Sequence, residues 1–478
     1  MSVIFCKPLT LDQRAPVLSS TARSVLNLLY FFNPDCIQRS LLTAPPAQYE
    51  NPAFSFLRNK EELDEAIAEL AQLSVIDTDD DGNIELSCDS PFMKCQENQI
   101  NVAFTHAVRI LDRSLPDVWA EGSPGLNCHS LRAGELVVPH VIRIVDVTNR
   151  SKVPSKRRME WLELVLRAGR YSLESQQPDL SLHFVEYILQ EHRVPIFGAR
   201  MVPDIQSRTY TLHAQALLDL ARPRAAVAVL KALLQGQQAL RGPGSTSVAA
   251  VYDSLAFAHL ELDDQAAASA YLDKADVIYI NQGYLHYKIP RTRPIHALLH
   301  LRAGRFDDAV SSLERFWKER EMKIEDVKNE KDANYGGEIM LMARLLWGQG
   351  EFEKAQELAS QSITMRRTFY GPLGGPRVAE SLFFTAFILM ERGFPDLTLT
   401  ILGDLIDMGQ GGNPALYPHI ARAYWMLAKV EEGLGKDAAY VSELRANARQ
   451  IRRLIPGDEK SMKDNDDAFR NLVNWVLL

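Results

Sequence analysis

A short turn sequence occurs twice in the second half of this chain and constrains the fold more than any other feature. Residues 303–309 are Ala-Gly-Arg-Phe-Asp-Asp-Ala, and residues 349–355 are Gln-Gly-Glu-Phe-Glu-Lys-Ala. In both, a glycine ends an apolar helical segment, an aromatic residue stands two positions later, and an alanine lies in the next segment. Glycine supplies the positive φ of a helix C-cap, and small residues let two helices approach closely. The sequence therefore predicts a repeated helical hairpin.

The same spacing extends over the last two thirds of the chain. Each unit has a small residue in its expected first helix, a second packing position twelve residues later, and units follow every 41 to 46 residues. Gly304, Gly350, Gly393 and Gly435 occupy one turn position. The units are longer than the simplest tetratricopeptide repeat, but their pattern is tetratricopeptide-like, whereas HEAT-type repeats fit the length and not the turn. We expect an all-α, tetratricopeptide-like, right-handed solenoid of about seven helical hairpins. The small residues are Ala168, Ala214, Ala256, Ala297, Ala343, Ala386 and Ala428.

Residues 17–90 predict a small domain of another kind before the solenoid. Helices are expected at residues 19–32, 36–42 and 60–73, followed by two short strands around the acidic turn at 77–82. Three helices and a two-stranded wing are the order of a winged-helix-like domain. The third helix carries five acidic residues between Glu61 and Glu69, so we expect a structural or protein-facing module and not a DNA reader.

Residue composition and the positions of proline and glycine predict the remaining segment boundaries, the charge of the partners and the location of the chain. Residues 1–16 are expected to form an irregular arm, 91–158 a helical linker and hinge, 159–455 the repeats, and 456–478 a helix that caps the array. A net charge of -8 argues against nucleic acid or anionic membranes as partners. Five cysteines without a CxxC pair, no signal peptide and no long apolar run predict a cytoplasmic location, with the nucleus as the alternative.

The motifs that could carry chemistry have simpler structural explanations. Asp77 to Cys88 matches several positions of an EF-hand loop, but Cys88 stands where calcium needs a bidentate Glu, so an acidic β-turn is predicted. His296 and His300 have zinc-ligand spacing without the Glu of a metalloprotease, so packing or partner contact is expected. The sequence contains no phosphate-binding loop and no nucleophile elbow. We therefore predict no catalytic residue, no metal site and no cofactor.

The predicted binding site consists of aromatic and basic residues on the first helices of the later units. These helices line the concave face of a tetratricopeptide superhelix, and helical spacing places positions around the small residue on that face. Aromatic side chains beside arginine are typical of interaction hot spots. The alternative is packing against neighbouring helices, which is favoured for Phe383 and Phe387. The predicted partner-binding residues are Arg302, Arg344, Trp347, Phe383, Phe387, Met390, Trp425 and Lys429.

Four stretches of the chain, at residues 28–37, 66–76, 135–145 and 469–475, carry a resemblance to a known family. They resemble fungal NLR-like proteins, which join a nucleotide-binding domain to a winged helix and tetratricopeptide repeats. Residues 91–95, Pro-Phe-Met-Lys-Cys, differ from the family's His-Arg-Leu-Val-like segment, and no nucleotide-binding domain precedes the winged helix. The resemblance implies the winged-helix and repeat region of such a protein, without NTP-driven switching by this chain alone. The four stretches are Leu-Leu-Tyr-Phe-Phe-Asn-Pro-Asp-Cys-Ile at 28–37, Ala-Ile-Ala-Glu-Leu-Ala-Gln-Leu-Ser-Val-Ile at 66–76, Glu-Leu-Val-Val-Pro-His-Val-Ile-Arg-Ile-Val at 135–145 and Phe-Arg-Asn-Leu-Val-Asn-Trp at 469–475.

These patterns predict a non-catalytic scaffold or regulatory adaptor that holds a protein or peptide partner in its concave groove. Two alternatives stay open. One is an enzyme or accessory protein that acts on a small molecule in a cavity of the helical array, with His140, His183 or His296 as base. The other is a truncated NLR-like protein that lacks its NTPase domain.

Overall fold

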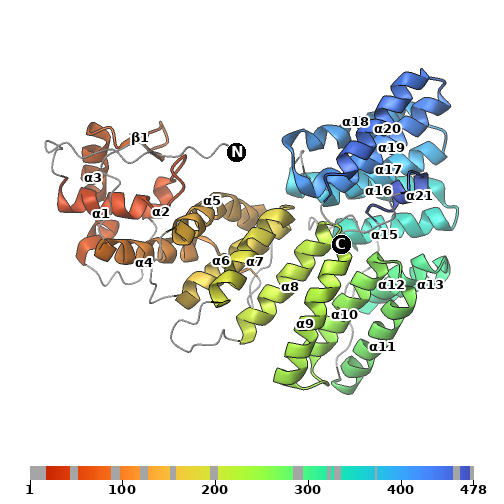
Figure 1. Cartoon of the computed structure of the whole chain (residues 1–478), viewed down its shortest axis with the longest axis horizontal. Helices are drawn as coiled ribbons and strands as arrows, with labels where there is room; N and C mark the ends of the chain where they lie inside the picture. Colours follow the sequence, from red (N-terminus) through yellow and green to blue (C-terminus); the bar gives the residue numbers. More distant parts are fainter. Residues whose placement is uncertain are drawn as a thin grey trace. The chain divides into compact units, whose positions relative to one another are not determined.

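The computed structural model divides into two compact units, which are described separately (Figure 1). Unit 1 comprises Met1–Tyr171 and Tyr187–Glu191, and unit 2 comprises Ser172–Glu186 and His192–Leu478. The predicted arm at 1–16, Cys88 at the end of the EF-hand-like run, and most of the predicted hinge lie outside the described residues. The structure describes residues 18–43, 52–87, 97–118, 128–150, 158–193, 203–283, 294–319, 323, 326–327, 335–371, 374–455 and 463–473.

Unit 1 begins with short helices followed by a two-stranded sheet. Strands β1 (Ile76–Thr78) and β2 (Ile84–Leu86) pair antiparallel, with Ile76 opposite Leu86, and Ile37 forms a further bridge to Ile84. Short helices and two paired strands thus follow one another in the expected order, and their assignment to a winged-helix-like domain stays a prediction. Its helices are α1 (Ser20–Leu29), α2 (Arg39–Thr43), the 3-10 helix η1 (Pro52–Arg58) and α3 (Lys60–Gln72); α4 (Glu97–Ser114), α5 (Cys128–Arg150) and most of α6 (Arg158–Glu174) complete the unit.

The buried His140 connects α5 by hydrogen bonds to the segment between α1 and α2. His140 Nδ1 accepts a hydrogen bond from the backbone N–H of Asn33 at 2.9 Å, and Nε2 lies 3.0 Å from Gln38 Oε1. A backbone N–H only donates and an amide oxygen only accepts, so the ring is neutral with its proton on Nε2. Burial lowers the pKa of His140 to about 4, which keeps it neutral.

Unit 2 is built of consecutive antiparallel helical hairpins, and this confirms the predicted all-α hairpin solenoid. In Figure 1 they follow one another from α8 (Pro203–Asp219) to α20 (Ala438–Arg452). Helix α7 (Pro178–Arg193) precedes them, and α21 (Asp466–Arg470) packs against α19. The hairpins pair α8 with α9 (Pro223–Arg241), α10 (Thr246–Glu261) with α11 (Gln265–Asn281), α12 (Ile295–Arg302) with α13 (Phe306–Glu319), α15 (Tyr335–Gly348) with α16 (Phe352–Tyr370), α17 (Pro376–Glu391) with α18 (Pro395–Asp407), and α19 (Tyr417–Gly433) with α20.

The turn inside each hairpin has one geometry. Gly304, Gly350, Gly393 and Gly435 all have positive φ, between 68° and 83°, as the sequence predicts. The next residue's N–H then bonds the carbonyl five residues back, for example Arg305 to His300 at 2.9 Å.

Three earlier turns, including the one between α6 and α7, make the same bond without glycine. Gln176, Ala221 and Asp263 hold the left-handed position there. Gln176 stands eight residues after Ala168 and not seven, so the first unit is shifted by one residue from the predicted register.

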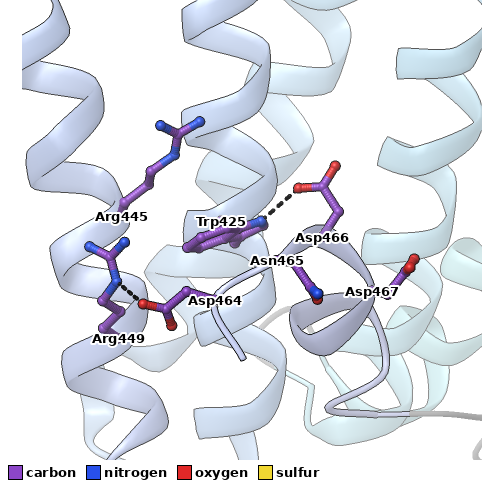
Figure 2. A pocket seen from close by; sticks show the side chains of 7 residues that line it. All are labelled: Trp425, Arg445, Arg449, Asp464, Asn465, Asp466 and Asp467. Carbon is purple, nitrogen blue, oxygen red and sulfur yellow. Dashed lines mark hydrogen bonds and ion pairs between the residues drawn. The ribbon is translucent and has the colours of Figure 1, made fainter. Parts of the chain in front are cut away.

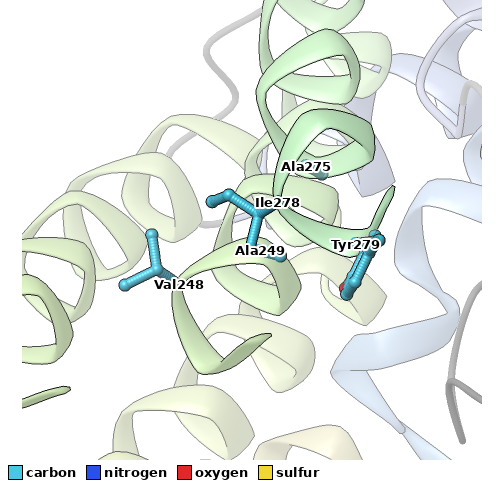
Figure 3. Packing of buried hydrophobic residues seen from close by; sticks show 5 residues of the cluster. All are labelled: Val248, Ala249, Ala275, Ile278 and Tyr279. Carbon is cyan, nitrogen blue, oxygen red and sulfur yellow. The ribbon is translucent and has the colours of Figure 1, made fainter. Parts of the chain in front are cut away.

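The spacing of small residues explains why paired helices pack closely. Ala256 on α10 and Ala268 on α11 are fully buried, as are the corresponding Ala343 and Ala355. Near the start of α10 and the end of α11, Val248 and Ala249 pack against Ala275, Ile278 and Tyr279 (Figure 3). On α11 the buried residues Ala268, Leu272, Ala275 and Tyr279 recur at helical spacing, so one face of this helix packs inward, whereas α10 is buried on most sides.

One long-range contact inside unit 2 joins the turn after α6 to the start of α17. Gln176 Oε1 accepts a hydrogen bond from the backbone N–H of Arg377 at 2.8 Å. The Arg377 guanidinium donates to the Tyr370 hydroxyl at 2.7 Å and lies 3.5 Å from Glu174. Gly375 is required here because a Cβ at this position would overlap the side chain of Gln176. The turn therefore holds the α17 N-terminus in place.

Candidate partner-binding site

The eight predicted partner-binding residues lie on the first helices of successive hairpins: α12, α15, α17 and α19. We call them the partner strip. Phe383 and Phe387 are buried, with 5% and 8% exposure, because every residue from Pro376 to Leu389 of α17 is buried. Lys429 is exposed. The remaining members, which are half-buried and thus partly accessible, are Arg302, Arg344, Trp347, Met390 and Trp425.

An aromatic cluster occupies the middle of the partner strip. The rings of Trp347 and Phe387 meet edge to face with centroids 5.2 Å apart, and Phe384 lies 6.1 Å from Phe387. The Arg344 guanidinium lies over the Phe384 ring at 4.7 Å. Among the described residues, the Trp347 indole N–H is buried without an acceptor. Burying an N–H group without an acceptor costs free energy, and an oxygen atom placed against it would remove that cost.

A buried ion triad links three first helices beneath these aromatic residues. The Glu380 carboxylate on α17 forms ion pairs with Arg344 on α15 and Arg422 on α19. Glu380 is fully buried, and the side chain of Arg422 is 2% exposed. The Arg422 guanidinium also lies over the Phe383 ring at 3.9 Å, and its Nη2 atom lies 3.0 Å from Nδ1 of His419. The triad therefore fixes the spacing of α15, α17 and α19.

Burial dominates the electrostatics of this region. It lowers the pKa of Arg344 to about 9, with a further contribution from Arg422, and lowers the pKa of Arg422 to about 9. Burial also keeps the pKa of His419 well below its usual value, so this imidazole is neutral beside the triad. Without the Glu380 carboxylate, this buried positive charge would lose its nearest counterion.

Arg302 is held separately from the aromatic cluster. Its guanidinium lies 3.3 Å from Asp263 and donates to the backbone carbonyl of Leu260 at 3.2 Å. Burial lowers the pKa of Arg302 to about 10. The structure thus places Arg344, Trp347 and Phe387 around Phe384, and Phe383 against Arg422. Arg302 instead contacts the turn between α10 and α11.

Trp425 and Lys429 contact the C-terminal segment, residues 463–473. The Trp425 indole N–H donates to Asp466 Oδ1 at 2.9 Å, and Lys429 Nζ donates to Asp466 Oδ2 at 2.7 Å. The Phe469 ring stacks on Trp425 at 4.1 Å with only 6° between the ring planes. Figure 2 shows Trp425 between α20 and this segment, beside a pocket of about 510 Å³. Its lining residues are Trp425, Arg445, Arg449, Asp464, Asn465, Asp466 and Asp467.

The other sequence candidates have identifiable structural partners. Asp79, in the acidic turn between β1 and β2, accepts hydrogen bonds from the backbone and side chain of Asn83, and these lower its pKa. His296 lies 3.3 Å from Asp276, whereas the His300 ring faces Arg305 at 2.9 Å. Their i, i+4 spacing therefore does not bring the two rings to one shared partner.

Sequence reasoning did not find Glu380, Arg422, Asp466 or Phe469. A signal for the first two was present, because Glu380 and Arg422 both stand six residues before the small residue of their unit. Charged residues at equivalent inward-facing positions of neighbouring repeats indicate an ion pair between them. No local pattern relates Asp466 and Phe469 to Trp425, since chain folding alone brings them together.

Comparison with known protein families finds a match to one short region of the chain. Residues 14–88 match a family described as Domain of unknown function (DUF7779). Comparison with curated proteins finds no match. Across the described residues, no helix is long and apolar enough to cross a bilayer.

Among solved structures, the chain is similar to the Rap conjugation gene regulator of the plasmid pLS20 in complex with the Phr* peptide. The identity is 13% and the TM-score 0.47, over 92% of this chain and 97% of that chain. It is also similar to a Signal Transduction ATPase with Numerous Domains protein with a tetratricopeptide repeat sensor from Pyrococcus horikoshii. There the identity is 12% and the TM-score 0.31, over 90% of this chain and 62% of that chain.

Proposed function

We propose that this protein is a non-catalytic interaction scaffold or regulatory adaptor that binds a protein or peptide segment along the partner strip. The observation that carries the proposal is the Trp347 indole N–H, which is buried without an acceptor among the described residues and lies beside an aromatic cluster. An unsatisfied buried donor costs about 1–3 kcal/mol, and a carbonyl oxygen of a bound peptide would remove that cost.

The rest of the partner strip suits this role. Arg344 and Met390 are half-buried, so a partner can reach them, while Phe383 and Phe387 are buried apolar neighbours on α17. Trp425 is also half-buried, and Phe469 of the same chain stacks on it. The Glu380 triad keeps α15, α17 and α19 at fixed spacing, so the binding surface is organised before a partner arrives. A preorganised surface of aromatic and arginine side chains is a common form of peptide-binding site.

The test is affinity purification from the source cell with Trp347→Phe, which keeps an aromatic ring and removes the N–H. We expect recovery of a specific partner to fall about fivefold or more, since a lost hydrogen bond to a buried donor is worth about 1–3 kcal/mol. The matched control is Leu397→Ala on α18, an exposed apolar residue outside the partner strip. Recovery with both Trp347→Phe and Trp347→Ala that equals recovery with the unchanged chain would show that the partner binds elsewhere.

Domain roles extend the proposal. We assign the binding array to residues 159–455 and the winged-helix segment of the NLR-like resemblance to the region that matches the family of unknown function. The helix order and the bridge between Ile37 and Ile84 support this assignment. The cytoplasm is the proposed location, with the nucleus as the alternative. The enzyme alternative built on His140 is disfavoured, since both ring nitrogens of His140 are engaged inside unit 1.

A further inference from the structure

The C-terminal segment contacts the partner strip through three adjacent chemical features. The Asp466 carboxylate accepts hydrogen bonds from Trp425 and Lys429, the Phe469 ring stacks on Trp425, and the Arg470 guanidinium lies over the Phe387 ring at 5.4 Å. Three of the eight strip residues are therefore occupied by one short stretch of the same chain. Each contact is of a kind that a bound peptide would make.

The side-chain ion pairs of this attachment are exposed and individually weak, whereas Arg422 and Arg452 also donate hydrogen bonds to the backbone carbonyls of Val473 and Lys463. The side chains of Asp466 and Lys429 are 45% and 47% exposed, and the Asp464–Arg449 pair is similarly open to water. Exposed ion pairs contribute little to stability. Helix α21 has five residues, so it is too short to be stable away from α19. These features describe a segment that a competitor could displace.

The apolar part decides what the competitor must carry. Phe469 and Leu472 are buried against Ala421, Ala448 and Ile455. Removing them without replacement would expose apolar surface on α19 and α20, so a competing segment needs an aromatic residue of its own. The pocket beside Trp425 leaves room there for additional side chains, and Arg445 and Arg449 border it (Figure 2).

We propose that residues 463–473 are a resident substitute for the partner, and that the partner is a protein segment with an acidic residue, an aromatic residue three positions later and a basic residue next to it. This is the pattern of Asp466, Phe469 and Arg470. The inference rests on the proposed function. It adds the chemical identity of the partner segment and a contact that lowers the partner's apparent affinity until the resident segment leaves.

The test uses the full chain and a fluorescent peptide with the sequence of residues 463–473, Lys-Asp-Asn-Asp-Asp-Ala-Phe-Arg-Asn-Leu-Val. A chain carrying Asp466→Asn and Phe469→Ala should release its own segment and bind the peptide, by fluorescence anisotropy, at least about tenfold more tightly than the unchanged chain. Adding Trp425→Ala to that variant should abolish binding. A peptide with the same two substitutions, Asp466→Asn and Phe469→Ala, is the matched control and should not bind.

Asp466→Asn alone guards against loss of folding, because it leaves the buried Phe469 in place. It should increase peptide affinity severalfold and raise hydrogen exchange in residues 463–473. If this single variant is folded and monomeric by sedimentation and shows neither change, the proposal is wrong. Equal peptide binding by the unchanged chain and both variants would also overturn it, since the peptide would then bind outside the occupied site. Dimerisation of the unchanged chain by exchange of this segment would make a second copy the occupant and likewise refute an external partner.

The purification experiment separates this inference from the proposed function. Loss of a partner with Trp347→Phe, together with unchanged recovery by Asp466→Asn, would keep the scaffold function and reject the resident segment as its competitor. No Trp347-dependent partner, together with peptide binding by the double variant, would reject the strip as the natural partner site and leave only the intramolecular contact.

Discussion

Neutralising Glu380 tests the physical account of the partner strip most directly. The change is Glu380→Gln, which keeps the shape of the side chain and one accepting oxygen but removes the negative charge. Glu380 is fully buried between Arg344 and Arg422, whose side chains are 14% and 2% exposed. The variant therefore leaves two mostly buried guanidinium groups without the carboxylate that they share.

The expected loss follows from the cost of an uncompensated buried charge. Breaking a buried ion pair by removing one partner costs about 3–5 kcal/mol. Arg344 reaches water at its edge, so we expect the lower value, about 3 kcal/mol. At roughly 2–4 °C per kcal/mol for a large domain, the unfolding midpoint should fall by about 6–12 °C.

The assay is thermal unfolding followed by circular dichroism, with two matched variants. Glu432→Gln removes an exposed carboxylate that lies 2.6 Å from Arg445, and its cost should not exceed about 1 kcal/mol. The triple change Arg344→Met, Glu380→Leu and Arg422→Met removes all three charges and should restore the midpoint to within a few degrees, since apolar replacements of a buried triad are often neutral or stabilising. A Glu380→Gln shift no larger than that of Glu432→Gln would refute the triad as the support of the strip.

Three further predictions concern other parts of the chain. Burial lowers the pKa of His140 to about 4, so the unfolded chain binds a proton below pH about 6.5 that the folded chain does not bind. The free energy of unfolding should therefore fall by about 3 kcal/mol as pH drops from 6.5 to 4. In unfolding titrations, His140→Gln should remove this pH dependence. Gly375→Ala should destabilise unit 2 by about 1–3 kcal/mol, because the added methyl group would overlap the side chain of Gln176. The control Gly403→Ala, where α18 leaves open space, should stabilise the chain by about 0.5–1 kcal/mol. Equal effects of the two changes in chemical denaturation would contradict the close approach at Gly375. Burial raises the pKa of Asp253 to about 7, and the Tyr279 hydroxyl donates a hydrogen bond to it at 2.8 Å. The folded chain keeps a proton that the unfolded chain releases, so the free energy of unfolding should fall as pH rises from about 4 to 7. Asp253→Asn should remove this pH dependence and raise the free energy of unfolding at pH 8 by about 2–4 kcal/mol.

The hairpin architecture could be predicted because its determinants are local. Gly304 and Gly350 mark turns that need positive φ, and Ala256 and Ala268 mark close helix contacts at fixed spacing. These requirements involve residues within one hairpin, so they leave a repeating trace in the sequence. The first unit was misplaced by one residue because Gln176, and not a glycine, holds its left-handed turn position.

The candidate site was predictable only in part. Helical spacing identified Arg344 and Trp347 as neighbours on one face, and the structure places both beside the aromatic cluster. The preference for packing at Phe383 and Phe387 agrees with their burial, but it came from the usual burial of aromatic residues and not from spacing, which does not separate them from the half-buried Trp347. The predicted roles of these residues in binding stay predictions until a partner is measured.

The sequence by itself determined the helices, their pairing into hairpins and the positions of the turns, since backbone conformation and apolar periodicity act over a few residues. Only the tertiary structure decided that Glu380 would join α15 to α19, that Gln176 would meet Arg377, and that Asp466 and Phe469 would cover Trp425. These contacts connect residues 36 to 201 positions apart. Their formation depends on how neighbouring hairpins pack and on where the chain returns, and of these contacts only the Glu380–Arg422 pair has a signal in the repeat register.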